Sequence, residues 1–231
     1  MRKSACPLLE DMNNLYKKEN DKFKKFTGII QARVGSTRYP KKVIRKVYGD
    51  ISLLEFLGKR LLKSKLVKEF YIATTTHKED DEIVNIAKKL NFKVIRGDEK
   101  DVLGRFVLAA NEIKNENIVR ITGDCPLFDA GLLDKAVEIF LDKKIEYLCN
   151  FDPPTYPDGL DLEIFTKESL IEADKCCEDI KIREHVTPWI RKCGKFKKHN
   201  IKNNLDLSNM RWTVDEPEDF ILIKNIIKEF G

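Results

Sequence analysis

A short apolar run near the start of the chain breaks off into a loop of small and basic residues. Residues 28–32 are expected to form a buried strand. The loop that follows carries Arg33, Gly35, Ser36, Arg38, Lys41 and Lys42. Free backbone N–H groups, a hydroxyl and arginine forks are the groups that hold a polyphosphate. The pattern therefore predicts a site for a nucleoside triphosphate at the end of this strand.

Two aspartates follow apolar strands elsewhere in the chain. Asp124 comes after residues 118–122, and Asp215 comes after residues 211–214. Magnesium in proteins usually takes one or two carboxylates together with waters and substrate phosphates. Two strand-end aspartates beside a phosphate loop therefore predict a magnesium site. Each aspartate could instead cap the helix that follows it, and both interpretations stay open at this stage.

A second polar set begins within a turn-rich segment at residues 152–159 and continues after it. Its members are Tyr156, Gly159, Asp161, Glu163, Arg183 and His185. Alternation over residues 160–165 places Asp161 and Glu163 on one face of a strand. Arg183 would suit a carboxylate or a phosphate. The set is therefore a candidate acceptor site, although structural ion pairs and a packed histidine explain the same residues.

A smaller polar cluster begins at His77. Asp80 and Asp81 follow it, at the start of a helical stripe over residues 81–90. Aspartate is a favoured residue at a helix N-terminus. Capping of this helix is therefore the preferred interpretation of both side chains.

Composition limits the classes of protein that the chain can belong to. Its 231 residues, 42% hydrophobic and 35% charged, are typical of one globular domain. No apolar run approaches the roughly 18 residues that span a bilayer, so no membrane partner is expected. The net charge of +5 comes from interspersed charges rather than a basic stripe, which argues against a nucleic-acid partner.

The cysteines and the N-terminal residues point to one compartment. The six cysteines are scattered without a Cys-x-x-Cys pair, so we expect reduced thiols and no zinc site. Residues 1–25 form a polar extension without a signal-peptide core. A cytoplasmic protein is therefore expected.

The elements that must position these residues alternate along the first part of the chain. Strands are predicted over 28–32, 70–74, 92–95 and 118–122, and helices over 81–90, 102–113 and 132–141. This alternation predicts βαβ units and a mostly parallel sheet. Ligands of such sheets bind at the carboxyl ends of the strands, where the polar clusters of this chain lie.

The second part of the chain is less regular. A strand over residues 160–165 is followed by helices around 167–177 and 181–193. A last core strand is predicted over 211–214. A terminal helix is predicted over 217–230, which Pro217 can start.

Six blocks in order, over about residues 26–230, carry a resemblance to a known family. They are IQARxGSTRxP (30–40), DVL (101–103), RITGDCPL (120–127), TYPxGLD (155–161), REHVTP (183–188) and RWTVDxPED (211–219). Together they resemble the cytidylyltransferase family of CMP-acylneuraminate and CMP-KDO synthetases. Within it they are most similar to the spore-coat polysaccharide cytidylyltransferase-like proteins.

The resemblance implies a three-layer α/β fold with a mostly parallel sheet, of the nucleotide-diphospho-sugar transferase (glycosyltransferase A-like) type. It implies a nucleotidyltransferase domain at residues 26–231, often in a homodimer. The implied reaction is attack of an acceptor oxygen on the α-phosphorus of CTP with release of pyrophosphate. The acceptor would be an acidic sugar or a sugar or polyol phosphate, for surface glycan biosynthesis.

The resemblance also implies roles for single residues. The catalytic set would be Arg33, Arg38, Lys42, Asp124 and Asp215, of which the two aspartates would hold Mg²⁺. The nucleotide would be bound by Ala32, Gly35, Ser36, Ala73, Thr74, Thr75, Gly97, Asp101, Arg105 and Gly123. The acceptor would lie against Tyr156, Gly159, Asp161, Glu163, Arg183 and His185.

Two residues depart from the family pattern. Lys41 replaces a loop glycine, which costs about 1 kcal/mol or more if its φ is positive. Gly104 stands where a polar residue is common, and it can weaken the start of its helix by up to about 1 kcal/mol relative to alanine.

Other functions remain open from the sequence. They are a sugar-1-phosphate nucleotidyltransferase that uses another base, a glycosyltransferase, and a nucleotide-binding protein without turnover. A glycosyltransferase usually carries Asp-x-Asp after a strand, whereas Pro126 stands two positions after Asp124. The intact set of loop cations and strand-end aspartates speaks against loss of turnover.

Overall fold

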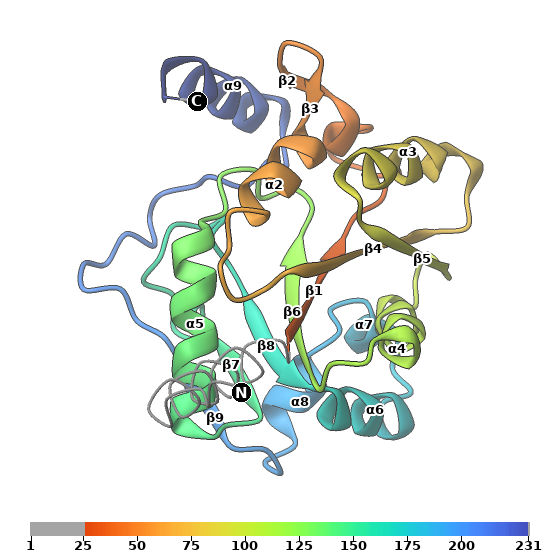
Figure 1. The fold of residues 1–231 in the computed structure, drawn as a ribbon, viewed down its shortest axis with the longest axis vertical. Helices are drawn as coiled ribbons and strands as arrows, with labels where there is room; N and C mark the ends of the chain where they lie inside the picture. The colour runs from red at the N-terminus through yellow and green to blue at the C-terminus, as the bar shows by residue number, and fades with distance from the viewer. Residues whose placement is uncertain (1–25, 231) are drawn as a thin grey trace, which may run out of the picture.

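The computed structural model describes residues 26–230 and is built around one seven-stranded sheet (Figure 1). The strand order is β5-β4-β1-β6-β8-β7-β9. The predicted extension at residues 1–25 lies outside the described residues, as does residue 231 at the end of the predicted domain.

The sheet is mostly parallel, as predicted. Its strands are β1 (Phe26–Gln31), β4 (Glu69–Thr75), β5 (Lys93–Gly97), β6 (Asn117–Thr122), β7 (Tyr147–Cys149), β8 (Glu163–Thr166) and β9 (Lys198–Asn200). β1 pairs in parallel with β4 and β6, and β4 pairs in parallel with β5. β8 runs antiparallel to both β6 and β7. The carboxyl ends of β1, β4 and β6 therefore meet at one edge.

Helices cover both faces of the sheet. They are α2 (Leu53–Leu61), α3 (Asp81–Leu90), α4 (Val102–Glu112), α5 (Ala130–Lys143), α6 (Lys167–Cys176), α7 (Ile180–Arg183), α8 (Pro188–Lys192) and α9 (Pro217–Phe230), with 3₁₀ turns η1 (Lys42–Ile44) and η2 (Lys78–Asp80). The core on one face is built with α2, α3 and α5, and the core on the other with α4, α6 and α8. In Figure 1, α5 and α4 lie on opposite sides of the central strands. The predicted three-layer α/β fold is thus confirmed.

The central strands β1 and β6 are mostly apolar because both of their faces are largely buried. Successive side chains of a strand point to opposite faces, so Ile29 joins one core and Ile30 joins the other. Both are fully buried. No helix in the described part of the chain is long and apolar enough to cross a membrane.

A small third core holds the end of the chain against the site. The hairpin of β2 (Lys46–Tyr48) and β3 (Ile51–Ser52) packs with α9 around Val47, Val214 and Ile223. Val214 is fully buried in this cluster. Its position fixes the next residue, Asp215, over the edge of the sheet.

The segment at 211–214, predicted as a core strand, does not form a ladder. Arg211 makes only an isolated bridge to Asp158, and Trp212 N–H donates to the Asp158 carbonyl at 2.6 Å. Glycine at position 159 allows this contact, because a Cβ there would lie only 2.5 Å from Thr213 N. Gly159 also has a φ of +108°, which other residues rarely adopt. A side-by-side approach of two loops thus replaces the predicted strand.

Two helices differ from the prediction for residues 181–193. The chain forms α7 and α8 instead of one helix, because Val186 between them has a φ of +67°. The short β7 and β9 and the β2–β3 hairpin were not predicted, since two or three residues carry too little periodicity.

The two departures from the family pattern differ in their structural effect. Lys41 has a φ of +63° in the loop after β1, which is a left-handed conformation. Gly104 N–H donates to the Asp101 carboxylate at 2.8 Å, capping α4. A Cβ at Gly104 would lie 2.6 Å from Asp101 Oδ2, so the glycine makes room for the cap.

The conformation of Lys41 generates a stability prediction. Lys41→Gly should raise the free energy of unfolding by about 1 kcal/mol, because glycine adopts positive φ without a Cβ clash. Thermal unfolding of both proteins would measure the difference. Lys41→Ala is the control, since it removes the side chain but keeps the Cβ. Equal free energies of unfolding for the glycine and alanine variants would show that the positive φ at residue 41 causes no strain.

Candidate active site

Residues on or after the neighbouring strands β1 and β6, together with others from α4 and from the segments next to α7 and α9, line one cavity at the carboxyl edge of the sheet. Its volume is about 400 Å³. Its predicted lining residues are Ala32, Arg33, Ser36, Arg38, Lys42, Arg105, Gly123, Asp124, His185 and Asp215. Its other lining residues are Gln31, Thr37, Val43, Arg120, Thr122 and Glu184. The predicted phosphate loop and strand-end aspartates therefore share one cavity.

Lys42 lies at the centre of this site. Its Nζ donates to Asp124 Oδ2 at 2.7 Å, to the Val214 carbonyl at 2.7 Å and to Asp215 Oδ1 at 2.8 Å. Burial lowers the pKa of Lys42, but the two carboxylates outweigh it, so that pKa lies above its ordinary value. Lys42 is therefore a fixed positive charge that joins three segments of chain.

The other two predicted phosphate-binding cations are also paired with carboxylates. Arg33 donates to Glu99 at 2.8 Å, and Arg38 lies 2.9 Å from Asp215. Both pairs are partly exposed, so an incoming anion has access to them. Each arginine can exchange its carboxylate for a phosphate oxygen, because guanidinium forms the same fork with either group.

The two aspartates fit a magnesium ion. Both contact the same Lys42 Nζ, so one small cation can be reached by both carboxylates. The residues that the structure describes gather no group of three or more acidic, histidine or cysteine side chains for a metal. Two carboxylates plus phosphate oxygens and waters is the ligand set that Mg²⁺ prefers.

The alternative of helix capping is wrong for both aspartates. α5 is capped by Asp129, whose carboxylate accepts from Leu132 N–H at 2.7 Å. The carboxylate of Asp215 faces Lys42. Its backbone N–H instead donates to Asp219 at 2.9 Å, which holds Asp215 in place at the start of α9.

Asp80 fastens the phosphate loop to the sheet. Its buried carboxylate accepts from Val34 N–H at 2.8 Å, Thr74 Oγ1 at 2.8 Å, and Thr75 N–H at 3.0 Å and Oγ1 at 2.5 Å. Burial raises the pKa of Asp80, but these bonds outweigh it and hold that pKa below its ordinary value. The prediction that the Asp80 side chain caps α3 is therefore wrong. Its carboxylate instead ties β4 to the loop after β1.

Arg105 on α4 is buried in the cavity wall without a full set of partners. Its side chain is 1% exposed, and among the described residues its Nε has no hydrogen-bond partner. Its other contacts are long, 3.4 Å to the Ala73 carbonyl and 3.5 Å to the Glu99 carbonyl. Buried donors are normally satisfied, so this guanidinium is suited to a ligand with acceptor atoms.

The chain matches a family model described as cytidylyltransferase over residues 27–227. The chain belongs to the cytidylyltransferase family. Its members transfer a nucleotidyl group, so this cytidylyltransferase is a nucleotidyltransferase.

Relatives support the assignment over most of their length. An uncharacterized protein of Methanocaldococcus jannaschii is 41% identical over 89% of this chain and 84% of its own. The spore coat polysaccharide biosynthesis protein SpsF of Bacillus subtilis is 32% identical over 88% of this chain and 86% of its own.

Solved structures are similar as well. A cytidylyltransferase from Leptospira borgpetersenii is 38% identical with a TM-score of 0.86, covering 90% of this chain and 88% of that one. A CMP:2-keto-3-deoxy-manno-octonic acid synthetase complexed with CTP has a TM-score of 0.67 at 15% identity, covering 89% of this chain and 99% of that one. The second likeness shows a shared fold.

Several predicted residues of the cytidylyltransferase lie outside the cavity lining. They are Gly35, Ala73, Thr74, Thr75, Gly97, Asp101, Tyr156, Gly159, Asp161, Glu163 and Arg183. Thr74 and Thr75 act through Asp80, and Gly97 leaves room for Arg105, because a Cβ there would lie 2.8 Å from Arg105 Cγ. The predicted contacts of these residues with the nucleotide or with the acceptor stay predictions.

Arg183 is fully engaged within the protein. It donates to Asp101 at 2.9 and 2.8 Å, to Asp174 at 2.6 Å, and to the carbonyls of Asp174 and Cys177 at 3.2 and 2.9 Å. These bonds occupy all five guanidinium N–H groups. The geometry therefore gives the predicted anion contact of Arg183 no support and indicates that it fastens α7 to the start of α4.

Glu163 and Asp161 lie beside each other on β8 and its approach, but in different surroundings. Glu163 is buried and accepts from Arg120 at 2.5 Å, from Tyr147 Oη at 2.5 Å and from Thr187 Oγ1. Burial, aided by the neighbouring negative charges, raises the pKa of Asp161 to about 6. Glu163 thus acts through its partners, whereas Asp161 is a carboxyl whose pKa lies above its ordinary range.

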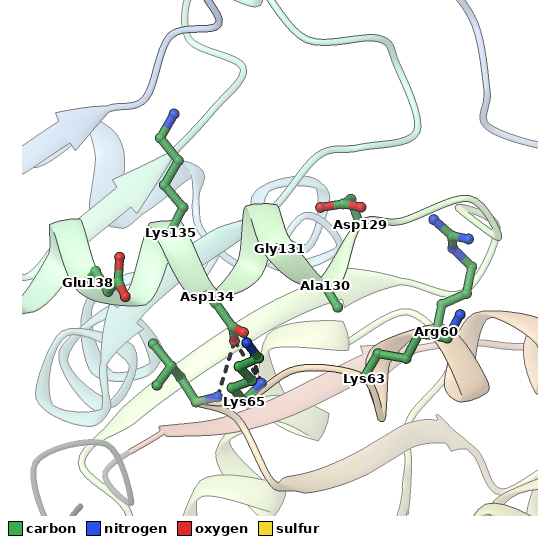
Figure 2. A pocket seen from close by; sticks show the side chains of 10 residues that line it. Arg60, Lys63, Lys65, Asp129, Ala130, Gly131, Asp134, Lys135 and Glu138 are labelled. Carbon is green, nitrogen blue, oxygen red and sulfur yellow. Dashed lines mark hydrogen bonds between the residues drawn. The ribbon is translucent and has the colours of Figure 1, made fainter.

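A second, larger cavity of about 650 Å³ lies between the end of α2 and the start of α5. Figure 2 shows Asp134 pointing from α5 toward Lys65. Asp134 accepts from Lys65 N–H, Leu66 N–H and Ser64 Oγ, so its carboxylate closes a loop of the scaffold. None of the predicted site residues lines this cavity.

The bonds of Asp80 generate a prediction with a defined pH dependence. Asp80→Asn should lower the free energy of unfolding at pH 7 by about 1–3 kcal/mol, since a buried donor loses its acceptor. The folded-state pKa of Asp80 is lowered, so this stabilisation is present above its unfolded value near 3.9. It is lost as the pH falls toward the folded-state pKa.

Urea unfolding of both proteins between pH 3 and 7 would test this dependence. Asp81→Asn is the matched control, because Asp81 is exposed and only pairs with Arg96. A stability difference between wild type and Asp80→Asn that does not shrink below pH 4 would contradict the role of Asp80.

Proposed function

We propose that the protein is a magnesium-dependent cytidylyltransferase that joins CMP from CTP to an acidic sugar or a sugar or polyol phosphate and releases pyrophosphate. The observation that carries the proposal is the meeting of Lys42, Asp124 and Asp215 beneath the basic loop after β1. Nucleotidyl transfer needs alignment and neutralisation of charge rather than covalent help from the protein.

The loop cations perform most of this work. Arg33, Arg38 and Lys42 bind the oxygens of the triphosphate in exchange for their present carboxylate partners. They stabilise the negative charge that develops when the bond between the α-phosphorus and its bridging oxygen breaks and the electron pair leaves with pyrophosphate.

Asp124 and Asp215 would hold the metal. When bound, Mg²⁺ neutralises charge on the phosphates and polarises the phosphoryl oxygens. The acceptor oxygen forms the new bond to the α-phosphorus; a phosphate acceptor attacks as its anion, and a hydroxyl acceptor loses its proton to solvent as the bond forms.

Arg105 supports a choice of cytosine. A guanidinium offers adjacent N–H donors, and cytosine presents two adjacent acceptors, O2 and N3. Uracil presents an N–H beside O2, which would face a donor. The Nε of Arg105, which has no partner among residues 26–230, and the buried position of the side chain therefore favour CTP over UTP.

The biological setting is proposed from a relative. SpsF is named for spore coat polysaccharide biosynthesis, which supports a role in building a surface glycan. The structure describes one chain, so the homodimer implied by the resemblance stays a prediction, as does the cytoplasmic location.

The choice of nucleotide is testable by thermal unfolding. CTP at about 100 times its dissociation constant should stabilise the protein by roughly 2.7 kcal/mol, and magnesium should enhance the shift. UTP, GTP and ATP should give smaller shifts, and a chelator should reduce the CTP effect. A larger shift with UTP, GTP or ATP than with CTP would contradict the proposed choice of cytosine. No shift with any of the four nucleotides would contradict the whole proposal.

The metal role is testable by substitution. An Asp124→Ala, Asp215→Ala double variant should lose at least about 100-fold in pyrophosphate release, because the charge neutralisation is removed. Pyrophosphate release with CTP, Mg²⁺ and a panel of acidic sugars and sugar phosphates would measure it. Asp142→Ala on the exposed face of α5 is the control. Full turnover in the double variant would contradict the proposal that Asp124 and Asp215 hold the metal.

A further inference from the structure

Arg120 is a cavity residue to which no role was predicted. It lies on β6, in register with Ile29 of β1 on one side and Glu163 of β8 on the other. Its side chain is 14% exposed and lines the cavity together with Thr122 and His185. It is therefore a nearly buried positive charge with one side toward the cavity.

The guanidinium of Arg120 is fixed from behind. Its Nη1 donates to Glu163 at 2.5 Å, and its Nε and Nη2 donate to Gln31 Oε1 at 3.3 and 3.0 Å. Glu163 is fixed in turn by Tyr147 and Thr187. Arg120 cannot turn away from the cavity without breaking this buried network.

The hydrogen bonds of Arg120 leave donors available. The described partners occupy three of its N–H groups, and a guanidinium has five. Arg183, the predicted anion contact, has all five occupied. Among these two arginines, only Arg120 can therefore offer a fork to a carboxylate or phosphate without first losing a partner.

The place of Arg120 in the sheet separates it from the nucleotide groups. Arg105 lies on α4 and contacts the carbonyl of Ala73 on β4, whereas Arg120 lies on β6 and contacts β8. β1 runs between these two strands and carries the phosphate loop. A nucleotide bound by that loop and by Arg105 leaves the side toward β8 for the acceptor.

We propose that Arg120, held by Glu163 and Gln31, binds the anionic group of the acceptor and makes the site selective for a sugar that carries a carboxylate or a phosphate. This inference rests on the proposed function. Glu163 is then a positioning residue, which orients Arg120 from the far side. The predicted importance of Glu163 is explained without direct contact with the substrate.

The test uses inorganic phosphate as the smallest anionic probe and glucose as a neutral one. Wild type is first saturated with CTP and Mg²⁺, which occupies the loop cations. Phosphate should then raise the unfolding midpoint further, and glucose should not. In Arg120→Gln the dissociation constant for phosphate should rise at least tenfold, while that for CTP should change less than threefold.

Two further variants separate binding from folding. Arg120→Lys keeps the charge beside Glu163 and should retain part of the phosphate affinity. The double variant Arg120→Gln, Glu163→Gln removes both buried charges together and should fold while failing to bind phosphate. Arg45→Gln, at an exposed loop position, is the matched control and should bind phosphate normally.

The outcomes are distinguishable from those of the proposed function. No stabilisation of wild type by CTP would contradict the proposed function itself. With CTP bound, phosphate affinity that is unchanged in Arg120→Gln, or no phosphate binding to wild type, would overturn the role of Arg120. An equal loss of CTP and phosphate affinity would also overturn it, because Arg120 would then belong to the nucleotide site.

Discussion

The Nζ atom of Lys42 is where segments up to 173 residues apart in the sequence meet. The 3₁₀ turn after the phosphate loop supplies the lysine, the end of β6 supplies Asp124, and the approach to α9 supplies Asp215. A buried charge without partners is costly, so the folded chain must bring all three segments together. The packing of α9 on the β2–β3 hairpin serves this requirement, because it fixes Val214 and hence the carboxylate that follows.

Much of this site could be predicted because it depends on local sequence and on one topological rule. The phosphate loop and Asp124 each follow a strand directly, and parallel strands bring their carboxyl ends to one edge. The fold class was predictable for the same reason. Asp215 lines the same cavity in spite of a wrong strand prediction for 211–214, since hydrogen bonds to the Asp158 carbonyl hold that segment beside residues 158–159.

The unpredicted parts of the site depend on pairings between distant residues. Arg120 and Glu163 are 43 residues apart and meet only because β8 enters the sheet antiparallel to β6. Asp80 was predicted to cap a helix, because its sequence context does not show that Val34 and two threonines donate hydrogen bonds to its carboxylate. Arg183 was predicted to contact an anion, because the sequence does not show that its carboxylate partners are Asp101, at the start of α4, and Asp174, on α6. Such networks have no periodicity to detect.

The pairing of Arg33, Arg38 and Lys42 with carboxylates has a consequence for the end of the catalytic cycle. Under the proposed function, a triphosphate enters by exchange: it replaces the carboxylates of Glu99 and Asp215 on Arg33 and Arg38. Pyrophosphate leaves a set of cations whose former partners remain attached to the scaffold nearby. Those carboxylates act at high effective concentration and compete for the same N–H groups. The protein thus carries its own counter-ions, which favour the release of a product that would otherwise bind tightly.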